Sequence, residues 1–181
     1  MTEREERTMA DQEFAKKLVK KCLDKGADQA EVYCQSGSNL SLRVRNGRVE
    51  TVQESSTRGV GFRVFVKGSL GFSSSNDFSA KALEEALSSA VRFARHTTPD
   101  PNNVLPDDRT ETPVEGLYDP ALADIKVDDG IRLARDVEEK ALAHAGVSKS
   151  AGASFGRGTG EVVLANSLGL AKSYRQTVCG Y

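Results

Sequence analysis

The dipeptide Asn46-Gly47 constrains the fold of this chain more than any other feature of its sequence. The preceding residues 40–45 alternate between apolar and polar side chains, which is typical of a strand with one buried face. A two-residue turn between strands needs positive φ at both positions, and Asn followed by Gly adopts these angles most readily. In this register Arg43 lies opposite Glu50, so opposite charges meet across the strands. The sequence therefore predicts an antiparallel hairpin that turns at residues 46 and 47.

The strand after this turn departs from the alternation of the strand before it. Val44 and Val49 face the same side in the two-residue register, whereas Val52 falls on the other side. Burial of both valines of the second strand would require one extra residue in that strand. We therefore expect a bulge or bend over residues 51–53.

Three further segments before residue 75 have the composition of strands. Residues 30–35 and 59–66 are rich in β-branched and aromatic side chains, and a turn at Lys67-Gly68-Ser69 leads into residues 70–74. Strands joined by short connections usually pair with their sequence neighbours. We expect four or five strands in meander order, which together form one antiparallel sheet.

Two amphipathic helices flank these strands. The first is predicted over residues 3–26, with Gly26 as its stop, and the second begins at Ser79 or at the alternative cap Asp77 and ends near His96. Each carries an apolar stripe at helical spacing that can cover one face of the sheet. The stripe residues are Phe14, Ala15, Leu18, Val19 and Cys22 in the first helix, and Leu83, Ala86, Leu87, Ala90, Val91 and Ala94 in the second.

A proline-rich stretch divides the chain. Residues 97–120 contain all five prolines of the sequence, and prolines at this density block both helices and central strands. We place a domain boundary near Glu115. Residues 1–114 then form one domain, and residues 115–181 begin a second.

The second domain is predicted to contain a helix followed by strands. Asp128 can cap the helix, which runs to about Ala145 and stops at Gly146. Its expected buried residues are Ile131, Ala134, Val137, Ala141 and Leu142. Strand-like runs follow at residues 148–155, 161–166 and 170–181, with a glycine-rich turn at residues 156–160.

The pattern is still strand-like at Tyr181, so we expect this second domain to be unfinished. The predicted fold class is α+β, an antiparallel meander sheet covered by helices and followed by the start of a second α+β domain.

Charge and hydropathy exclude several classes of protein. Lys and Arg number 25 against 26 Asp and Glu, a balance that argues against an electrostatic binder of nucleic acid. No apolar run of about 18 residues predicts a membrane span, and the charged residues 1–7 do not resemble a secretory signal. Cys22, Cys34 and Cys179 form no C-x-x-C pair and are typical of reduced thiols. We expect a cytoplasmic protein.

Several small-residue segments resemble catalytic or binding motifs only in part. Gly156–Gly160 lacks the Lys of a phosphate-binding loop and precedes a strand, so a hairpin turn is the better interpretation. Residues 59–64 lack the third glycine of a dinucleotide fingerprint. The three hydroxyls of residues 73–75 have no nucleophile elbow around them and are interpreted as a loop before the second helix.

The two histidines do not predict a metal centre. His96 and His144 each end a predicted helix, and no H-E-x-x-H motif supplies further zinc ligands. A catalytic cysteine would need one of these histidines as its base, and nothing local marks an activated thiolate. We therefore assign no catalytic and no metal-binding residue, and the substrate-binding residues are unknown.

Several short segments occur in a characteristic order along the chain. They are residues 30–33 (AEVY), 40–50 (LSLRVRNGRVE), 58–65 (RGVGFRVF), 71–79 (GFSSSNDFS), 117–120 (LYDP) and 164–169 (LANSLG). Together they resemble the N-terminal portion of the TldD/PmbA family, also called modulator of DNA gyrase. The resemblance spans about residues 27–174, and it is closer to the PmbA or TldE type of subunit than to the TldD type.

This resemblance implies a cytosolic metallopeptidase assembly that cleaves linear or unfolded peptides. In the family, a TldD-type subunit carries an H-E-x-x-x-H zinc helix and a further Cys ligand beyond the part seen here, and the PmbA type lacks this motif. No position of this sequence matches the motif, so zinc is expected only in the full-length TldD-type subunit. Whether this chain is itself an enzyme is left open. The implied partners are a TldD-like subunit or a homodimer, and a linear peptide substrate.

Two functions of different classes follow from these observations. The first is the non-catalytic N-terminal part of a peptidase subunit, which shapes the cavity and the subunit contact. A peptide could add to such a part as an extra strand at an exposed sheet edge. The alternative is a non-enzymatic module that binds gyrase or a toxin–antitoxin component.

Overall fold

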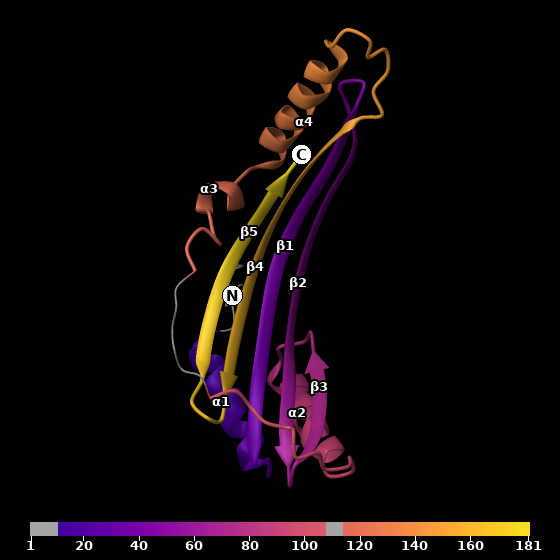
Figure 1. Ribbon diagram of the computed structural model, residues 1–181. Coiled ribbons are helices and arrows are strands. Elements are labelled where there is room, and N and C mark those ends of the chain that lie inside the picture. Colours follow the sequence, from indigo (N-terminus) through magenta and orange to yellow (C-terminus); the bar gives the residue numbers. More distant parts are fainter. Residues whose placement is uncertain (1–10, 108–113) are drawn as a thin grey trace. The chain divides into compact units, whose positions relative to one another are not determined.

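The structure is a computed structural model that describes residues 11–107 and 114–181. Its five strands form one sheet in the order β3-β2-β1-β4-β5, and four helices accompany them along the described chain (Figure 1). The predicted α+β class with an antiparallel sheet is confirmed. The residues before Asp11, with which the first helix was expected to begin, lie outside the described residues.

Two tight turns fold the first three strands, β1 (Gln29–Arg45), β2 (Arg48–Val66) and β3 (Ser69–Ser75). Asn46 and Gly47 have φ of 50° and 69°, and Lys67 and Gly68 have φ of 50° and 78°. These positive angles are those of the turn expected for two-residue hairpins. The predicted turn at residues 46 and 47 is therefore confirmed, as is the hairpin that pairs Val60–Val66 with β3.

The expected division of this region into four or five short strands is wrong, because three strands, two of them long, span it. Residues 36–39 continue β1 without interruption, although they are polar and rich in small side chains. A neighbouring strand explains their conformation, because the Ser38 and Thr159 hydroxyls lie 2.8 Å apart across the sheet. A sequence pattern cannot show a partner that lies 121 residues away along the chain.

The described residues form two compact units, and each is assembled from three stretches of chain. Of the described residues, unit 1 comprises 11–36, 58–107 and 161–174, and unit 2 comprises 37–57, 114–160 and 175–181. The long strands contribute to both units. The expected domain division at residues 114 and 115 stays a prediction.

Unit 1 packs helices α1 (Gln12–Asp24) and α2 (Ala80–Ala94) onto strand residues such as Val32 and Phe62. Both helices begin at a side-chain cap: the Asp11 carboxylate accepts from Phe14 N at 2.6 Å and the Ser79 hydroxyl accepts from Ala82 N at 3.3 Å. The stripes predicted for both helices are buried in this core, except that Phe14 is only partly buried.

Residues 97–107, expected to be part of a linker, are bound to the sheet of unit 1. The Thr97 hydroxyl donates to Leu70 O at 2.6 Å, and the backbone N–H of Asp100 donates to Gly68 O at 3.1 Å. Further along, Leu105 is buried and the Asn166 side chain donates to Pro106 O at 2.7 Å. Prolines prevent a helix or strand here, but the segment still packs as an ordered cover.

Unit 2 contains the short helix α3 (Pro120–Ala123), helix α4 (Val127–Leu142), most of strand β4 (Ala153–Asn166) and the end of strand β5 (Ala171–Gly180). Its apolar cluster is small and consists of Leu40, Leu42, Val44, Ala134 and Phe155.

Two details of the helix predicted from Asp128 to Ala145 are wrong. Lys126 precedes the first turn of α4 without a side-chain cap, and Asp128 lies inside that turn. The C-terminal part of the predicted buried face is exposed, since Ala141 and Leu142 both face solvent. Ala134 is buried as expected, and the other buried positions of α4 are Gly130 and Glu138, so that the three recur every four residues.

The glycine-rich turn expected at residues 156–160 is also wrong, because these residues lie within β4. Gly156 and Gly158 run beside β1, close to the carbonyl oxygens of Leu40 and Ser38. Since β1 provides a pairing partner along this stretch, the glycines stay extended. Glycine has a low intrinsic preference for strands, so the sequence alone does not predict that these residues are extended.

Candidate functional site

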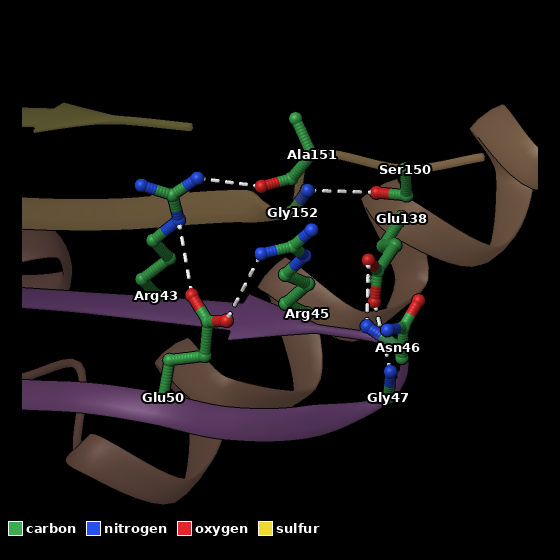
Figure 2. Close-up of polar contacts among 9 residues, drawn as sticks. All are labelled: Arg43, Arg45, Asn46, Gly47, Glu50, Glu138, Ser150, Ala151 and Gly152. Carbon is green, nitrogen blue, oxygen red and sulfur yellow. Dashed lines mark hydrogen bonds and ion pairs between the residues drawn. The ribbon is translucent and has the colours of Figure 1, made fainter.

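The strongest candidate site in the described residues is the β1–β2 hairpin of unit 2, together with the free edge of its second strand. Its turn is held by the side chain of Glu138, which projects from α4 and is only 3% exposed (Figure 2). One carboxylate oxygen accepts from Asn46 N and the other from Gly47 N, both at 2.9 Å. Arg135, also on α4, donates from its Nε to Gly47 O at 3.0 Å.

The surroundings of Glu138 keep its carboxylate charged. The N–H of Gly47 lowers the pKa of Glu138 below its ordinary value, and the Ser150 hydroxyl, Asn46 N–H and Arg45 charge act in the same direction. The backbone N–H groups of Asn46 and Gly47 have no partner within the turn, and the Glu138 carboxylate accepts from both. Glu138 therefore fixes the tip of the hairpin relative to α4.

The outward face of the hairpin carries a small charged network near its tip (Figure 2). Glu50 contacts Arg43 Nε at 3.4 Å and Arg45 Nη1 at 3.8 Å, which confirms the opposite charges expected across the strands. Arg43 also donates from Nη2 to Ala151 O at 2.5 Å. The network ties the hairpin to the loop before β4.

The free edge of β2 is the feature of this site that can bind another polypeptide. On the side away from β1, the neighbour of β2 is β3, and β3 pairs only with Val60–Val66. Residues 48–57 of β2, which belong to unit 2, therefore have no strand on that side in the described part of the chain. All of them are exposed, including Val49 and Val52.

An unpaired strand edge offers a row of backbone N–H and C=O groups to any extended chain. The exposure of both valines also removes the reason for which a bulge was expected at residues 51–53, although that bulge stays a prediction.

The cysteines considered as nucleophiles lie apart from this site. Cys22 and Cys34 are buried in the core of unit 1, and burial raises the pKa of the Cys22 thiol to about 12 and that of Cys34 to about 11. Cys179 is partly buried near the apolar cluster of unit 2. At neutral pH the two buried thiols stay protonated, so they are poor nucleophiles and poor metal ligands.

The histidines and serines are not brought together either. His96 and His144 follow α2 and α4, and no group of three His, Cys, Asp or Glu residues that could hold a metal occurs within residues 11–107 and 114–181. Ser75 bonds with the backbone of Asp77 just before α2, as expected of a loop that leads into a helix.

Sequence reasoning missed Glu138, which is the residue that organises the hairpin. One signal could have found it, because Glu138 lies four residues after Ala134 and so falls on the buried stripe of α4. A carboxylate at such a position needs a buried donor. The two N–H groups of the Asn46-Gly47 turn are donors of this kind.

The described residues thus form an α+β segment with an open sheet edge and a hairpin turn held by a buried glutamate. Two family models match the chain: PmbA/TldA metallopeptidase domain 1 over residues 30–94, and the PmbA/TldA metallopeptidase central domain over residues 120–181. The chain belongs to the PmbA/TldD family and corresponds to its N-terminal portion.

Curated relatives agree with this assignment. The metalloprotease PmbA of Escherichia coli O157:H7 is 32% identical over 155 residues, which cover 83% of this chain and 34% of the relative. A PmbA homologue of Haemophilus influenzae is 34% identical over 154 residues, with the same two coverages. The chain thus spans about a third of the length of the curated relatives it matches.

Solved structures share the fold. A protein from Bacteroides thetaiotaomicron described as a modulator of DNA gyrase matches with a TM-score of 0.79 and 28% identity, over 90% of this chain and 38% of that one. TldE from Thermococcus kodakarensis matches with a TM-score of 0.76 and 17% identity, over 91% of this chain and 37% of that one. Among the described helices, none has the length and apolar character that a membrane crossing requires.

Proposed function

We propose that this chain forms the non-catalytic N-terminal part of a PmbA/TldD-type subunit that takes part in the proteolysis of linear or unfolded peptides in the cytoplasm. The family membership supports the proteolytic role. The observation that carries the role of this part is the open β2 edge at residues 48–57, held by Glu138 at its turn. Such an edge can take up an extended strand, either from a peptide or from a partner subunit.

The zinc ion of the family does not fit the described residues. A zinc site needs three or four clustered N, S or O ligands, and the described residues bring no three such side chains together. In the proposal, this chain therefore carries out no chemical step. In the proposal, zinc and the hydrolytic chemistry belong to a TldD-type subunit, and this chain contributes a wall of the cavity and a subunit contact.

Cleavage assays test whether the hydrolytic chemistry belongs to the TldD-type subunit and not to this chain. The chain alone is expected to leave a linear peptide intact with or without added zinc, and a TldD-type subunit is expected to cleave it more efficiently when this chain is present. Zinc-dependent cleavage by the isolated chain would contradict the proposal. A variant that lacks the hairpin residues 44–49 should lose the stimulation, whereas a Lys149→Glu variant, altered on an exposed loop, should keep it.

A second candidate function rests on the neighbour from Bacteroides thetaiotaomicron, whose description names DNA gyrase. In this alternative the chain is a non-enzymatic module that binds gyrase or a toxin–antitoxin component. Direct titration of purified gyrase with the labelled chain tests it. Saturable binding together with no effect on peptide cleavage would favour the module over the peptidase role.

A further inference from the structure

The turn of the β1–β2 hairpin consists of a residue pair that is chemically reactive. Asn46-Gly47 is the one Asn-Gly pair of the sequence. Asparagine is a thermolabile residue, because its side chain can react with the backbone nitrogen of the next residue, and glycine obstructs this approach least. Both residues are exposed, and no atom lies within 4 Å of the place where a Cβ of residue 47 would be. The tip of the hairpin therefore has room for this reaction and is open to water.

We propose that Asn46 is a site of spontaneous deamidation, and that the bond from the Gly47 N–H to Glu138 protects it while the hairpin tip is closed. In this reaction solvent hydroxide removes the Gly47 N–H proton, the nitrogen attacks Cγ of Asn46, and ammonia leaves as a succinimide ring closes. Water then opens the ring at either of its carbonyl carbons. The net reaction consumes water and releases ammonia, and it leaves an aspartate or an isoaspartate at position 46.

The contacts of the turn oppose the first step (Figure 2). Attack requires the Gly47 nitrogen to turn away from Glu138 and toward the side chain of Asn46. The N–H groups of Asn46 and Gly47 both donate to the Glu138 carboxylate at 2.9 Å, so the peptide groups on both sides of Asn46 are fixed. Arg135 holds the next peptide group, since its Nε donates to Gly47 O at 3.0 Å. Ring closure therefore needs the tip to open first.

The charge of Glu138 acts in the same direction. The attacking nitrogen must lose its proton and become anionic, and a negative charge in direct contact disfavours that form. The pKa of Glu138 is lowered, so its carboxylate is charged at neutral pH and is a weak base toward the Gly47 N–H. Arg45 and Arg135 are the positive groups at the turn, where Arg45 stabilises the charge of Glu138 and Arg135 bonds to a carbonyl oxygen.

Modification would turn a transient opening of the tip into a lasting one. Either product has a new carboxylate on residue 46, whose own N–H donates to the buried carboxylate of Glu138. Two carboxylates that share a site repel each other, which weakens this contact. The isoaspartate also adds a methylene to the main chain, which no longer fits a two-residue turn between Arg45 and Arg48. Deamidation thus releases the free edge of β2 from its anchor on α4.

Peptide mapping by mass spectrometry measures the reaction, because the change from amide to acid raises the mass of the fragment that contains residue 46. The whole chain is incubated at mildly alkaline pH, either folded or unfolded in urea. Asn46 should deamidate at least about tenfold more slowly in the folded chain, which is the effect expected of a bond to a charged acceptor. This comparison needs no variant. Enzymatic methylation of isoaspartate identifies the second product.

Substitution of the acceptor tests the role of its charge. Glu138→Gln should accelerate deamidation of Asn46 in the folded chain by about tenfold or more. The rate at Asn102, an exposed asparagine of unit 1, should stay the same. Glu139→Gln, at the exposed neighbouring position, should alter neither rate. Asn46→Asp reproduces one product and should accelerate amide exchange at Gly47, and circular dichroism verifies that each variant is folded.

Three results would overturn the proposal: no modification of Asn46 in the unfolded chain, equal rates in the folded and unfolded chains, or a Glu138→Gln variant that deamidates as slowly as the wild type. The inference goes beyond the peptidase role proposed above and does not depend on it. A chain that fails to stimulate peptide cleavage but shows the expected rates at Asn46 would contradict the proposed function alone.

Discussion

The two compact units of this chain are stabilised by different kinds of contact. Unit 1 buries a continuous apolar cluster that joins two helices to the sheet, with Phe62 and Leu87 fully enclosed. Unit 2 has a much smaller apolar cluster around Phe155. Its elements are joined largely by charged side chains that bond to backbone groups, as Glu138 does at the hairpin turn and Arg157 does at Ile125 O at 2.7 Å.

This difference suggests that unit 1 mainly provides stability and that unit 2 mainly positions the candidate binding edge. Apolar burial is the dominant favourable contribution to folding and does not depend on direction. The larger apolar cluster of unit 1 is therefore expected to contribute most to the stability of the chain. Charge-assisted bonds to backbone groups fix geometry, since each needs a defined distance and direction. We expect the exposed β2 edge to be held in position by unit 2 while most of the unfolding free energy comes from unit 1.

Truncation of the unit 1 core is expected to have the largest effect. Phe62→Ala should lower the free energy of unfolding by about 3–5 kcal/mol, because it removes a fully buried ring and leaves a cavity. Phe72→Ala is the matched control in the same unit, since its ring is 59% exposed, and should cost less than about 1 kcal/mol. Urea denaturation followed by circular dichroism measures both. Equal losses would show that the cluster does not dominate the stability of unit 1.

Substitution of the hairpin anchor should act locally in unit 2. Glu138→Gln keeps one acceptor oxygen and places an NH₂ group against the other backbone donor. Amide exchange of Asn46 and Gly47 should then accelerate by about ten- to a hundredfold, the range expected when a bond to a charged group is lost. The amide of Val32 in unit 1 should change little. Glu139→Gln, at the exposed neighbouring position, is the control.

The same contrast explains what the sequence could and could not predict. The stripes of α1 and α2 and the Asn46-Gly47 turn were predictable, because each depends on residues close together in the chain. The buried face of α4 was only partly predictable. Its stripe includes Gly130, which packs closely against Phe155, and Glu138, whose partners lie about 90 residues away.

The predicted strand boundaries were wrong for a related reason. Residues 156–160 were interpreted as a turn because glycine has a low preference for strands. In the structure they pair along β1, from which they are separated by more than a hundred residues. A local pattern predicts local structure, whereas the continuity of a long strand depends on its neighbour. The free edge of β2 was not predicted either, because it depends on β2 running from Arg48 to Val66 as one strand, where two separate strands were expected.

Acid should weaken unit 2 through Glu138. The pKa of this carboxyl is lower in the folded chain than its ordinary value, so its contribution to stability is fully present above the unfolded pKa of about 4.3. That contribution is lost as the pH falls through the lower folded pKa. The stability difference between the wild type and Glu138→Gln should therefore be constant from pH 7 to about pH 5 and shrink below about pH 4. Urea midpoints measured across this range test it, and a pH-independent difference would contradict the role of the charge.

The smallest effect is expected for the exposed charge network of the hairpin. The Glu50 side chain is 38% exposed and lies 3.4 and 3.8 Å from its arginine partners, so Glu50→Gln should change stability by about 0.5 kcal/mol or less. At about 1 M salt, where the screening length is about 3 Å, this difference should vanish. Glu31→Gln in unit 1 is the comparison, because Glu31 is 10% exposed and contacts Arg63 at 2.7 Å. The loss of a buried partner should cost clearly more and persist in salt. If Glu50→Gln proves as costly as Glu31→Gln, unit 2 depends on its surface ion pairs, and the role given to buried acceptors such as Glu138 must be reduced.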